Sequence, residues 1–264
     1  MICRAIRGNS FQGFTAEGER VLVWAREIVS VYQGLKLEVE SLKQGVGGTL
    51  RIGIVPQCGV SLAQLLQQAQ AHYPDLRYQV AVLSADQLLE ALTNHSVDLG
   101  IGFFELALLA ELKFQTAPIV DRGVELVFNP ALFPALPLPL SLAQVAELPL
   151  CLAEPSHYFR RYLDENFRAT GLQPRLILES ASTFQLLQGV FTGLGCGIVP
   201  CGHLLPAMTP ALTTIPIAMP TMKRQTAMAI AAPGRAIPLA QVVFDFGRAW
   251  LAQHGVDGVA PWPE

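Results

Sequence analysis

Apolar side chains recur every three or four residues through the stretch 15–42, with polar and charged side chains between them. Such an alternation is the heptad rhythm of a coiled coil, so it predicts one long amphipathic helix over 15–45 that ends at Gly45–Gly48. A lone helix cannot bury such a stripe, and we therefore expect a dimerisation helix that packs against a partner helix. The stripe consists of Val21, Ala25, Ile28, Tyr32, Leu35, Val39 and Leu42.

Beyond residue 48 the pattern alternates between short β-type runs and helical stripes, which is typical of a doubly wound parallel α/β unit. One helix is predicted to open at Ser84, because Ser84 and Gln87 have the spacing of a capping box. The other predicted elements are strands over 49–55, 77–82 and 97–102 and a helix over 62–72. Ligands of such sheets bind beyond the carboxyl ends of the strands.

A second, smaller α/β alternation follows the proline-rich stretch 129–139, which is unsuited to regular structure. Two extended runs, 124–128 and 226–231, are predicted to cross between the two units, which makes the body two-lobed. The second unit contains a capping box at Ser141–Gln144, strands over 150–152, 175–179 and 196–199, and helices over 158–170 and 184–192. We assign lobe I to 49–123 and 226–264, including a final helix over 239–253, and lobe II to 129–220.

Composition adds few constraints to this picture. The chain has 264 residues, 51% of them hydrophobic, and a formal net charge of −3, so the chain as a whole is not a polyanion binder. No stretch approaches the ~18 unbroken apolar residues of a membrane span, and the first residues lack the apolar core of a signal peptide. Five scattered cysteines fit reduced thiols, and we expect a cytoplasmic protein without a membrane partner.

The glycines and cysteines offer little catalytic chemistry. Gly193–Gly197 lacks the third glycine of a dinucleotide fingerprint and lies before a strand rather than after one, so a tight turn is favoured. Cys196 and Cys201 with His203 nearby are disfavoured as a metal site, because no second ligand pair has zinc-like spacing. Cys58, after the first strand of lobe I, is either a reactive thiol or a small space-filling residue. No cofactor is expected.

Polar residues near the carboxyl ends of the lobe II strands are open to two interpretations. His157, with Arg160 and Arg161, fits an anion-facing helix start, but it also fits a solvated one. Glu154 and Glu179 end different strands, so structural roles are favoured over a catalytic pair.

Four segments together resemble the LysR-type transcriptional regulators. The run Arg7–Glu19 resembles the end of that family's wing hairpin and the start of its linker helix. Gly48–Gly53 and Val97–Ile101 resemble the first and third strands of its effector domain, and Gly193–Pro200 resembles its late glycine–proline signature. The resemblance implies a transcriptional regulator with a linker helix and a two-lobed effector domain of the type 2 periplasmic-binding-protein kind.

The resemblance also implies DNA as a partner, but the recognition helix of the family is missing. Only 14 residues precede Thr15, where a complete member carries well over ~50. We therefore interpret 1–14 as the remnant of a winged helix-turn-helix domain, with Arg4 and Arg7 as its remaining phosphate contacts. Two arginines provide little affinity, so DNA binding by this chain is expected to be weak or absent.

By the same resemblance, the effector lies between the lobes, within 49–264. Hydroxyls, an amide and helix N-termini fit a small polar or anionic molecule. The implied contacts are Gln57, Cys58, Ser61, Ser84, Phe103, Phe104, Ser156, His157 and Ser182, with Pro56, Glu154 and Ser180 beside them. The other expected partner is a second copy of the chain, in a homodimer or tetramer. The alternatives are a cytoplasmic solute-binding-type protein without a transcriptional role and a two-lobed enzyme, for which no general base with a placed partner is found.

Overall fold

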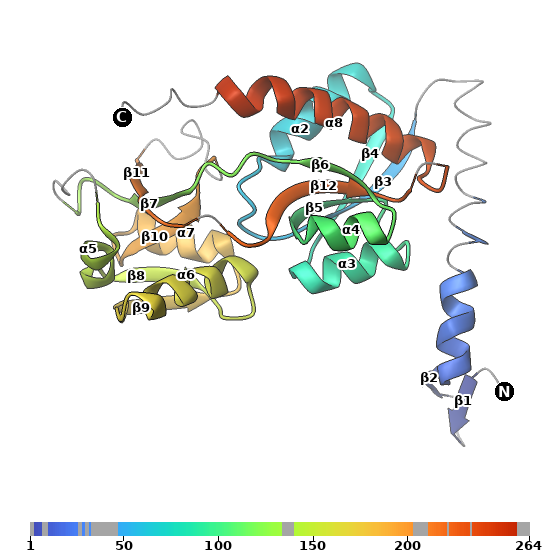
Figure 1. Ribbon diagram of the computed structural model, residues 1–264, viewed down its shortest axis with the longest axis horizontal. Coiled ribbons are helices and arrows are strands. Elements are labelled where there is room, and N and C mark those ends of the chain that lie inside the picture. The colour runs from blue at the N-terminus through green and yellow to red at the C-terminus, as the bar shows by residue number, and fades with distance from the viewer. Residues whose placement is uncertain are drawn as a thin grey trace.

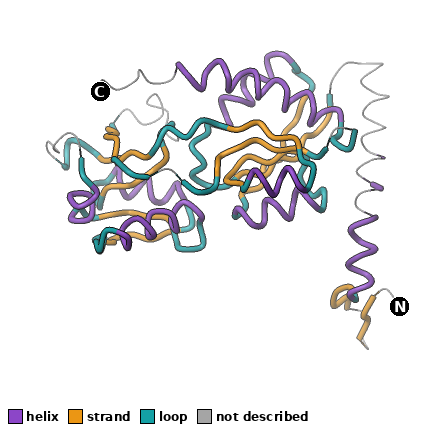
Figure 2. The backbone as a smooth tube through the Cα atoms, in the orientation of Figure 1, coloured by secondary structure: helices purple, strands orange, loops and turns teal. Residues whose placement is uncertain are grey.

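The computed structural model describes residues 3–6, 10–25, 28, 29, 32, 47–133, 140–202, 211–220, 222–232 and 234–257. Its body consists of two α/β lobes, each built on its own five-stranded sheet (Figure 1). A separate hairpin and helix stand at the N-terminus (Figure 2).

The N-terminal segment is a two-stranded antiparallel hairpin followed by a helix. Strand β1 (Cys3–Ile6) pairs with β2 (Ser10–Phe14). Residues 16–25 are helical, and the hydroxyl of Thr15 accepts the N–H of Gly18 at 3.1 Å, which caps the first turn. A hairpin followed directly by a helix is the order that the family resemblance implies. Arg4 lies in β1, and Arg7 lies outside the described residues.

The described part of the predicted apolar stripe faces solvent in the single chain. Val21, Ile28 and Tyr32 are 47%, 68% and 66% exposed, and Ala25 is exposed too. Such an apolar stripe is unfavourable in water unless another helix covers it. The remaining positions of the stripe, Leu35, Val39 and Leu42, lie outside the described residues, so dimerisation through the helix stays a prediction.

Lobe I has the sheet order β4-β3-β5-β12-β6. Its strands are β3 (Gly48–Ile54), β4 (Leu76–Val82), β5 (Leu99–Phe104), β6 (Gln115–Pro118) and β12 (Gln225–Ile230). Strands β4, β3 and β5 run parallel, which confirms the predicted parallel unit, and β12 is a reversed strand that the sequence analysis did not predict. Helices α2 (Leu62–His72) and α8 (Pro238–Asp257) cover one face, and α3 (Ala85–Thr93) and α4 (Leu106–Glu111) cover the other (Figure 1).

Lobe II has the sheet order β11-β7-β10-β8-β9. Its strands are β7 (Val124–Phe128), β8 (Leu150–Ala153), β9 (Leu176–Ser180), β10 (Cys196–Pro200) and β11 (Thr213–Ile217). Helices α5 (Leu142–Glu147) and α6 (Tyr158–Ala169) pack with one face of the sheet, and α7 (Thr183–Phe191) packs with the other. The predicted alternation of this lobe is therefore confirmed.

Two expectations about the crossings between the lobes are wrong. The run 124–128 is not a crossing, because it forms β7, which is hydrogen-bonded between β10 and β11 in the lobe II sheet. Likewise, 226–231 is not the return crossing, because its residues form most of β12, between β5 and β6. The chain instead crosses at 119–123, after β6, and at 218–224, before β12. A run of extended residues has the same sequence pattern in a crossing as in a strand of a sheet. Only its hydrogen-bonded partner strands show which of the two it forms.

The core of lobe I is fixed by close packing of α3 on the sheet and by one ion pair. A Cβ added to Gly53 would lie 2.4 Å from Leu88 Cδ1, so α3 lies too close to the strand for a side chain there. Asp98, whose side chain is 3% exposed, accepts hydrogen bonds from the Arg51 backbone N–H and from its guanidinium, with Nη2–Oδ1 at 2.5 Å. This pair ties β3 to the start of β5 and satisfies a buried carboxylate.

Among the described residues, no helix combines the length and apolar character needed to cross a membrane.

Candidate functional site

The lobes meet where the carboxyl ends of β3 and β5 face the end of β10 and the start of α6. Gly59 follows β3 with φ +71, and a Cβ built on it would lie 3.3 Å from Pro200 Cβ, so this loop touches the end of β10. In a second contact between the lobes, the rings of Phe103 and Tyr158 lie 4.9 Å apart. We call the region between these two contacts the lobe seam.

Gln57 lies two residues before Gly59, next to the first of these two contacts, and carries an unsatisfied acceptor. It sits in the turn after β3, with φ +55 and only 4% of its surface exposed. Its Oε1 is buried without a hydrogen-bond partner. A buried, unpaired amide oxygen costs about 1–3 kcal/mol, and a left-handed backbone at a non-glycine residue adds strain. Both costs are typical of a residue that meets a ligand.

His157 directly precedes Tyr158, which makes the second contact between the lobes, and it carries a second unsatisfied atom. It occupies the N-cap position of α6 but makes no side-chain cap bond, and its Nδ1 is buried without a partner. Its neighbour Ser156 donates its hydroxyl to Glu154 Oε1 at 2.6 Å. The remaining described side-chain atom of this kind is the Tyr78 hydroxyl on β4. Two of these three orphaned groups thus belong to residues expected to contact an effector.

Arg160 does not face an anion site, contrary to one of the two interpretations of this helix start. The residue is 8% exposed, and its Nη1 donates to the Ala153 carbonyl at 2.5 Å and to Glu179 Oε2 at 2.7 Å. Its Nε donates to Asp164 Oδ1 at 2.8 Å. Arg160 therefore anchors the start of α6 to β8 and β9. Glu179 binds Arg160 and Glu154 binds Ser156, so these carboxylates have the structural roles that the sequence favoured.

Cys58 is a packing residue. It is 3% exposed, and burial raises the pKa of its thiol to about 12. The thiolate is the nucleophilic form, so a thiol this hard to ionise is unreactive near neutral pH. Of the two interpretations of Cys58, the space-filling one fits.

The predicted serines have different surroundings. Ser84 forms the predicted capping box with Gln87, at 3.2 Å and 3.0 Å, and Ser182 accepts the N–H of Gln185 at 3.4 Å at the start of α7. Both hydroxyls are engaged by their own helices. Ser61 precedes α2 without a side-chain cap bond and lines a different cavity, which lies between the loop before α2, the first crossing and the end of α8.

Phe103 and Phe104 end β5 rather than following it. They are 1% and 3% exposed, and they line a small pocket together with Asp86 and Arg224. Phe103 also contacts Tyr158, so one predicted wall residue does reach the lobe seam. The predicted contacts therefore fall into separate groups. Gln57 and His157 lie beside the two contacts between the lobes, Ser84 and Ser182 cap helices, and Ser61 lines another cavity. Phe103 and Phe104 line the small pocket.

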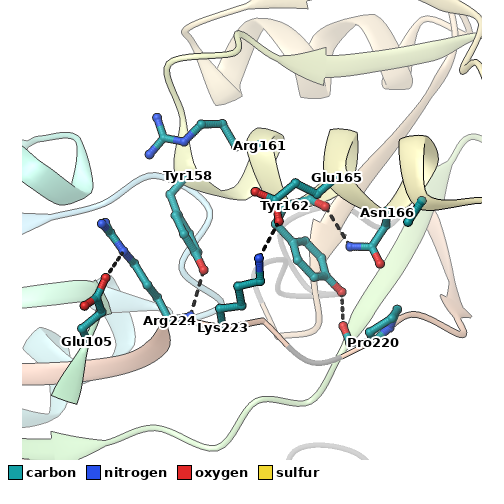
Figure 3. Close-up of a pocket in the computed structure, with 10 residues that line it drawn as sticks. Glu105, Tyr158, Arg161, Tyr162, Glu165, Asn166, Pro220, Lys223 and Arg224 are labelled. Carbon is teal, nitrogen blue, oxygen red and sulfur yellow. Dashed lines mark hydrogen bonds and ion pairs between the residues drawn. The ribbon is translucent and has the colours of Figure 1, made fainter. Parts of the chain in front are cut away.

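Sequence reasoning missed the cluster around Tyr158 and Arg224 at one edge of the lobe seam. The Tyr158 hydroxyl accepts the Arg224 backbone N–H at 2.9 Å, and the Arg224 guanidinium carbon lies 5.2 Å from the ring centre (Figure 3). The same guanidinium pairs with Asp86 at 3.1 Å and Glu105 at 3.7 Å in lobe I. Tyr158 and Arg224 lie 66 positions apart, so no local pattern indicates their contact.

This cluster borders a cavity of about 370 Å³ between α6 and the second crossing. Beside it, the Tyr162 hydroxyl donates to the Pro220 carbonyl, and Lys223 Nζ lies 3.3 Å from Glu165 Oε2 (Figure 3). These contacts hold the second crossing against α6, so the crossing is fixed to the same helix start that carries His157 and Tyr158.

No group of three or more histidine, cysteine, aspartate or glutamate side chains among the described residues is placed to hold a metal ion. Cys196 is buried in β10, and His203 lies outside the described residues.

The two-lobed fold and its seam define a class of ligand-binding α/β protein, and comparison identifies the family. The family described as LysR substrate binding domain matches residues 43–252. The chain therefore belongs to the LysR family through this domain, as the four sequence segments suggested.

A curated relative supports the assignment. The HTH-type transcriptional regulator BsdA of Bacillus subtilis (strain 168) is 25% identical over 189 residues, which are 70% of this chain and 64% of that protein. The chain thus spans less than two thirds of the length of this relative.

Solved structures share the fold. A full-length OxyR variant from Pseudomonas aeruginosa matches with a TM-score of 0.65 and 18% identity, covering 95% of this chain and 80% of that one. The effector binding domain of QuiR in complex with shikimate matches with a TM-score of 0.61 and 16% identity, covering 79% of this chain and 99% of that one.

Proposed function

We propose that the chain is the effector-binding and self-associating part of a cytoplasmic LysR-type transcriptional regulator. In this proposal a small polar or anionic molecule binds in the lobe seam, where it contacts Gln57 and His157. The observation that supports it most is the pair of buried, unpaired atoms, Gln57 Oε1 and His157 Nδ1. A ligand with its own donors and acceptors would satisfy both, and recover the cost of leaving them unpaired.

The class of effector follows from the groups present. An amide oxygen needs a donor, and an imidazole nitrogen takes either role according to its tautomer. The backbone N–H groups at the start of α6 favour negative charge. A small hydroxylated carboxylate offers all three partners, and the shikimate held by the QuiR domain is a molecule of this kind.

Binding would act on the relation between the lobes. The lobe seam is lined from β3 in lobe I and from α6 in lobe II, and a molecule in contact with both favours the arrangement in which they are close. The exposed N-terminal stripe would join two chains through a helix pair, and a change between lobes would be transmitted along this assembly to the DNA-binding part of a regulator.

The test is a thermal-shift screen of small hydroxylated and aromatic carboxylates, with shikimate among them, followed by calorimetry on any compound that binds. We expect at least one acid to raise Tm, since ligand at about 100 times Kd adds about 2.7 kcal/mol of stability. Gln57→Leu and His157→Gln are expected to weaken the binding of that acid, with the acid recovered unchanged after incubation. If a hit binds both variants as tightly as the parent chain, it does not use the lobe seam and the site assignment is wrong.

The regulatory role has its own test. Deleting the gene is expected to change the transcription of particular operons, and to abolish their response to the acid identified by the screen. Unchanged transcription with and without that acid would contradict a role as a regulator and favour a plain solute-binding function.

A further inference from the structure

Arg224, the last residue of the second crossing, contacts both lobes at one edge of the lobe seam. Its guanidinium pairs with two carboxylates of lobe I, Asp86 in the first turn of α3 at 3.1 Å and Glu105 after β5 at 3.7 Å. In lobe II it meets Tyr158, the first residue of α6 (Figure 3). The backbone N–H of Arg224 donates to the Tyr158 hydroxyl at 2.9 Å, and the guanidinium carbon lies 5.2 Å from the centre of the ring. One residue therefore connects α3 and the end of β5 to the start of α6.

Tyr158 receives a second contact from lobe I. The ring of Phe103, which is 1% exposed in β5, lies 4.9 Å from the ring of Tyr158. Arg224 directly precedes β12, which lies between β5 and β6, so its backbone is also fixed to the lobe I sheet. Both groups that meet Tyr158 are thus anchored in lobe I. Since Tyr158 directly follows His157, these contacts also fix the helix start that carries His157.

The two carboxylates act mainly by orienting the guanidinium. The side chains of Asp86 and Glu105 are 74% and 62% exposed, so each ion pair alone contributes little. The Arg224 side chain is only 26% exposed, and its planar guanidinium presents five N–H donors in a fixed geometry, so two acceptors together define its position. The oriented cation then lies against the Tyr158 ring, where partial exclusion of water strengthens the cation–π contact.

We propose that Arg224 is the central residue of a latch that holds the two lobes together at this edge of the lobe seam. The latch consists of Asp86, Glu105, Tyr158 and Arg224. When the lobes part at this edge, Tyr158 loses its contacts with lobe I and the Arg224 backbone N–H becomes open to water. The latch therefore sets the fraction of free chains in which the edge is open. It acts in the chain without ligand and does not depend on the effector proposed for the lobe seam.

Hydrogen exchange of the Arg224 backbone N–H reports the latch directly. Because this N–H is bonded to a hydroxyl of the other lobe, its exchange requires the lobes to part at this edge. Mass spectrometry with fragmentation at single residues follows this N–H in the full chain. Tyr158→Phe removes the acceptor but keeps the ring, and it should bring the exchange rate close to that of an unprotected amide, which calibrates the open state.

Arg224→Met keeps an unbranched side chain and removes the guanidinium. We expect the N–H at position 224 to exchange about fivefold faster, after correction for the changed side chain, which is the effect of losing one cation–π contact at a partly exposed site. Two comparison amides lie within single lobes. The Val55 N–H is bonded to the Ile101 carbonyl in lobe I and the Cys196 N–H to the Pro149 carbonyl in lobe II, and both exchange rates should stay unchanged.

Two further variants separate the latch from the charge of the crossing. Glu105→Gln should accelerate the Arg224 N–H by about two- to threefold, because the guanidinium loses one of the groups that orient it. Lys223→Met removes the neighbouring cation of the same crossing, whose side chain is 87% exposed and pairs with Glu165 at 3.3 Å. The rate in Lys223→Met should equal that of the parent chain.

Three results would overturn the proposal. They are an equal rate in the parent chain and Arg224→Met, an acceleration in Arg224→Met that is as large for the Val55 and Cys196 amides, and an effect of Lys223→Met as large as that of Arg224→Met. The second result would mean that Arg224 stabilises the whole fold rather than the contact between the lobes. If Arg224→Met fails to fold, Glu105→Gln provides the test, since Glu105 is exposed, and an unchanged rate in that variant overturns the proposal instead.

Discussion

Replacing Gln57 by leucine should stabilise the free protein while weakening its ligand. Gln57 is 4% exposed and its Oε1 has no partner, so the free chain bears the cost of a desolvated acceptor, about 1–3 kcal/mol. Leucine has a similar volume and no polar atom, and it is no more strained than glutamine at φ +55. We therefore expect the free energy of unfolding of Gln57→Leu to rise by about 1 kcal/mol or more.

Equilibrium unfolding in urea measures this change, provided that the slope with denaturant stays constant. Gln67→Leu is the matched control, since Gln67 is an exposed glutamine on α2 whose amide is open to water, and its effect should stay within about 0.5 kcal/mol. The same Gln57→Leu protein should bind the seam ligand about tenfold more weakly. If Gln57→Leu instead destabilises the free chain by more than about 1 kcal/mol, Oε1 is satisfied without a ligand and the reasoning fails.

Three further predictions concern assembly, the thiol and a helix cap. Ile28→Asp, in the stripe, should shift the chain toward monomer in light scattering, whereas Val23→Asp, on another face of the helix, should not. The folded chain should protect Cys58 from alkylation at pH 8. Because the pKa of the Cys58 thiol rises to about 12 on folding, its contribution to stability is present below pH ~9 and is lost as pH rises toward 12. Cys58→Ala should flatten that alkaline loss of stability, which urea unfolding measures. Ser84→Ala should cost about 1 kcal/mol by removing a cap, as seen by thermal unfolding.

Local signals in the sequence predicted local structure well. Helix α2 has the predicted bounds, and both capping boxes form with both of their hydrogen bonds, because each depends on residues three positions apart. The alternation of strands and helices was enough to define two α/β lobes. The roles of β7 and β12 were missed, because a strand's place in a sheet is set by partners distant in the chain.

The candidate site was predictable in outline only. Gln57 and His157 follow strand ends, where ligands of parallel sheets bind, and this rule together with the family resemblance predicts them as effector contacts. The position of Arg160 at a helix start was compatible with an anion site, but Glu179 of strand β9 binds its guanidinium. The separate cavity lined by Ser61 and Trp250 lies where the first crossing and the end of α8 come close to the loop before α2. These segments are distant in the sequence, so no local pattern predicts that they lie together.

The most direct test of the lobe seam is a crystal structure of the chain with the acid that gives the largest thermal shift. The account predicts that the acid lies between β3 and the start of α6, with one of its donors within hydrogen-bond distance of Gln57 Oε1 and one of its polar atoms within the same distance of His157 Nδ1. An acid bound elsewhere, with both of these atoms still unpaired, would contradict the claim that the lobe seam is the effector site.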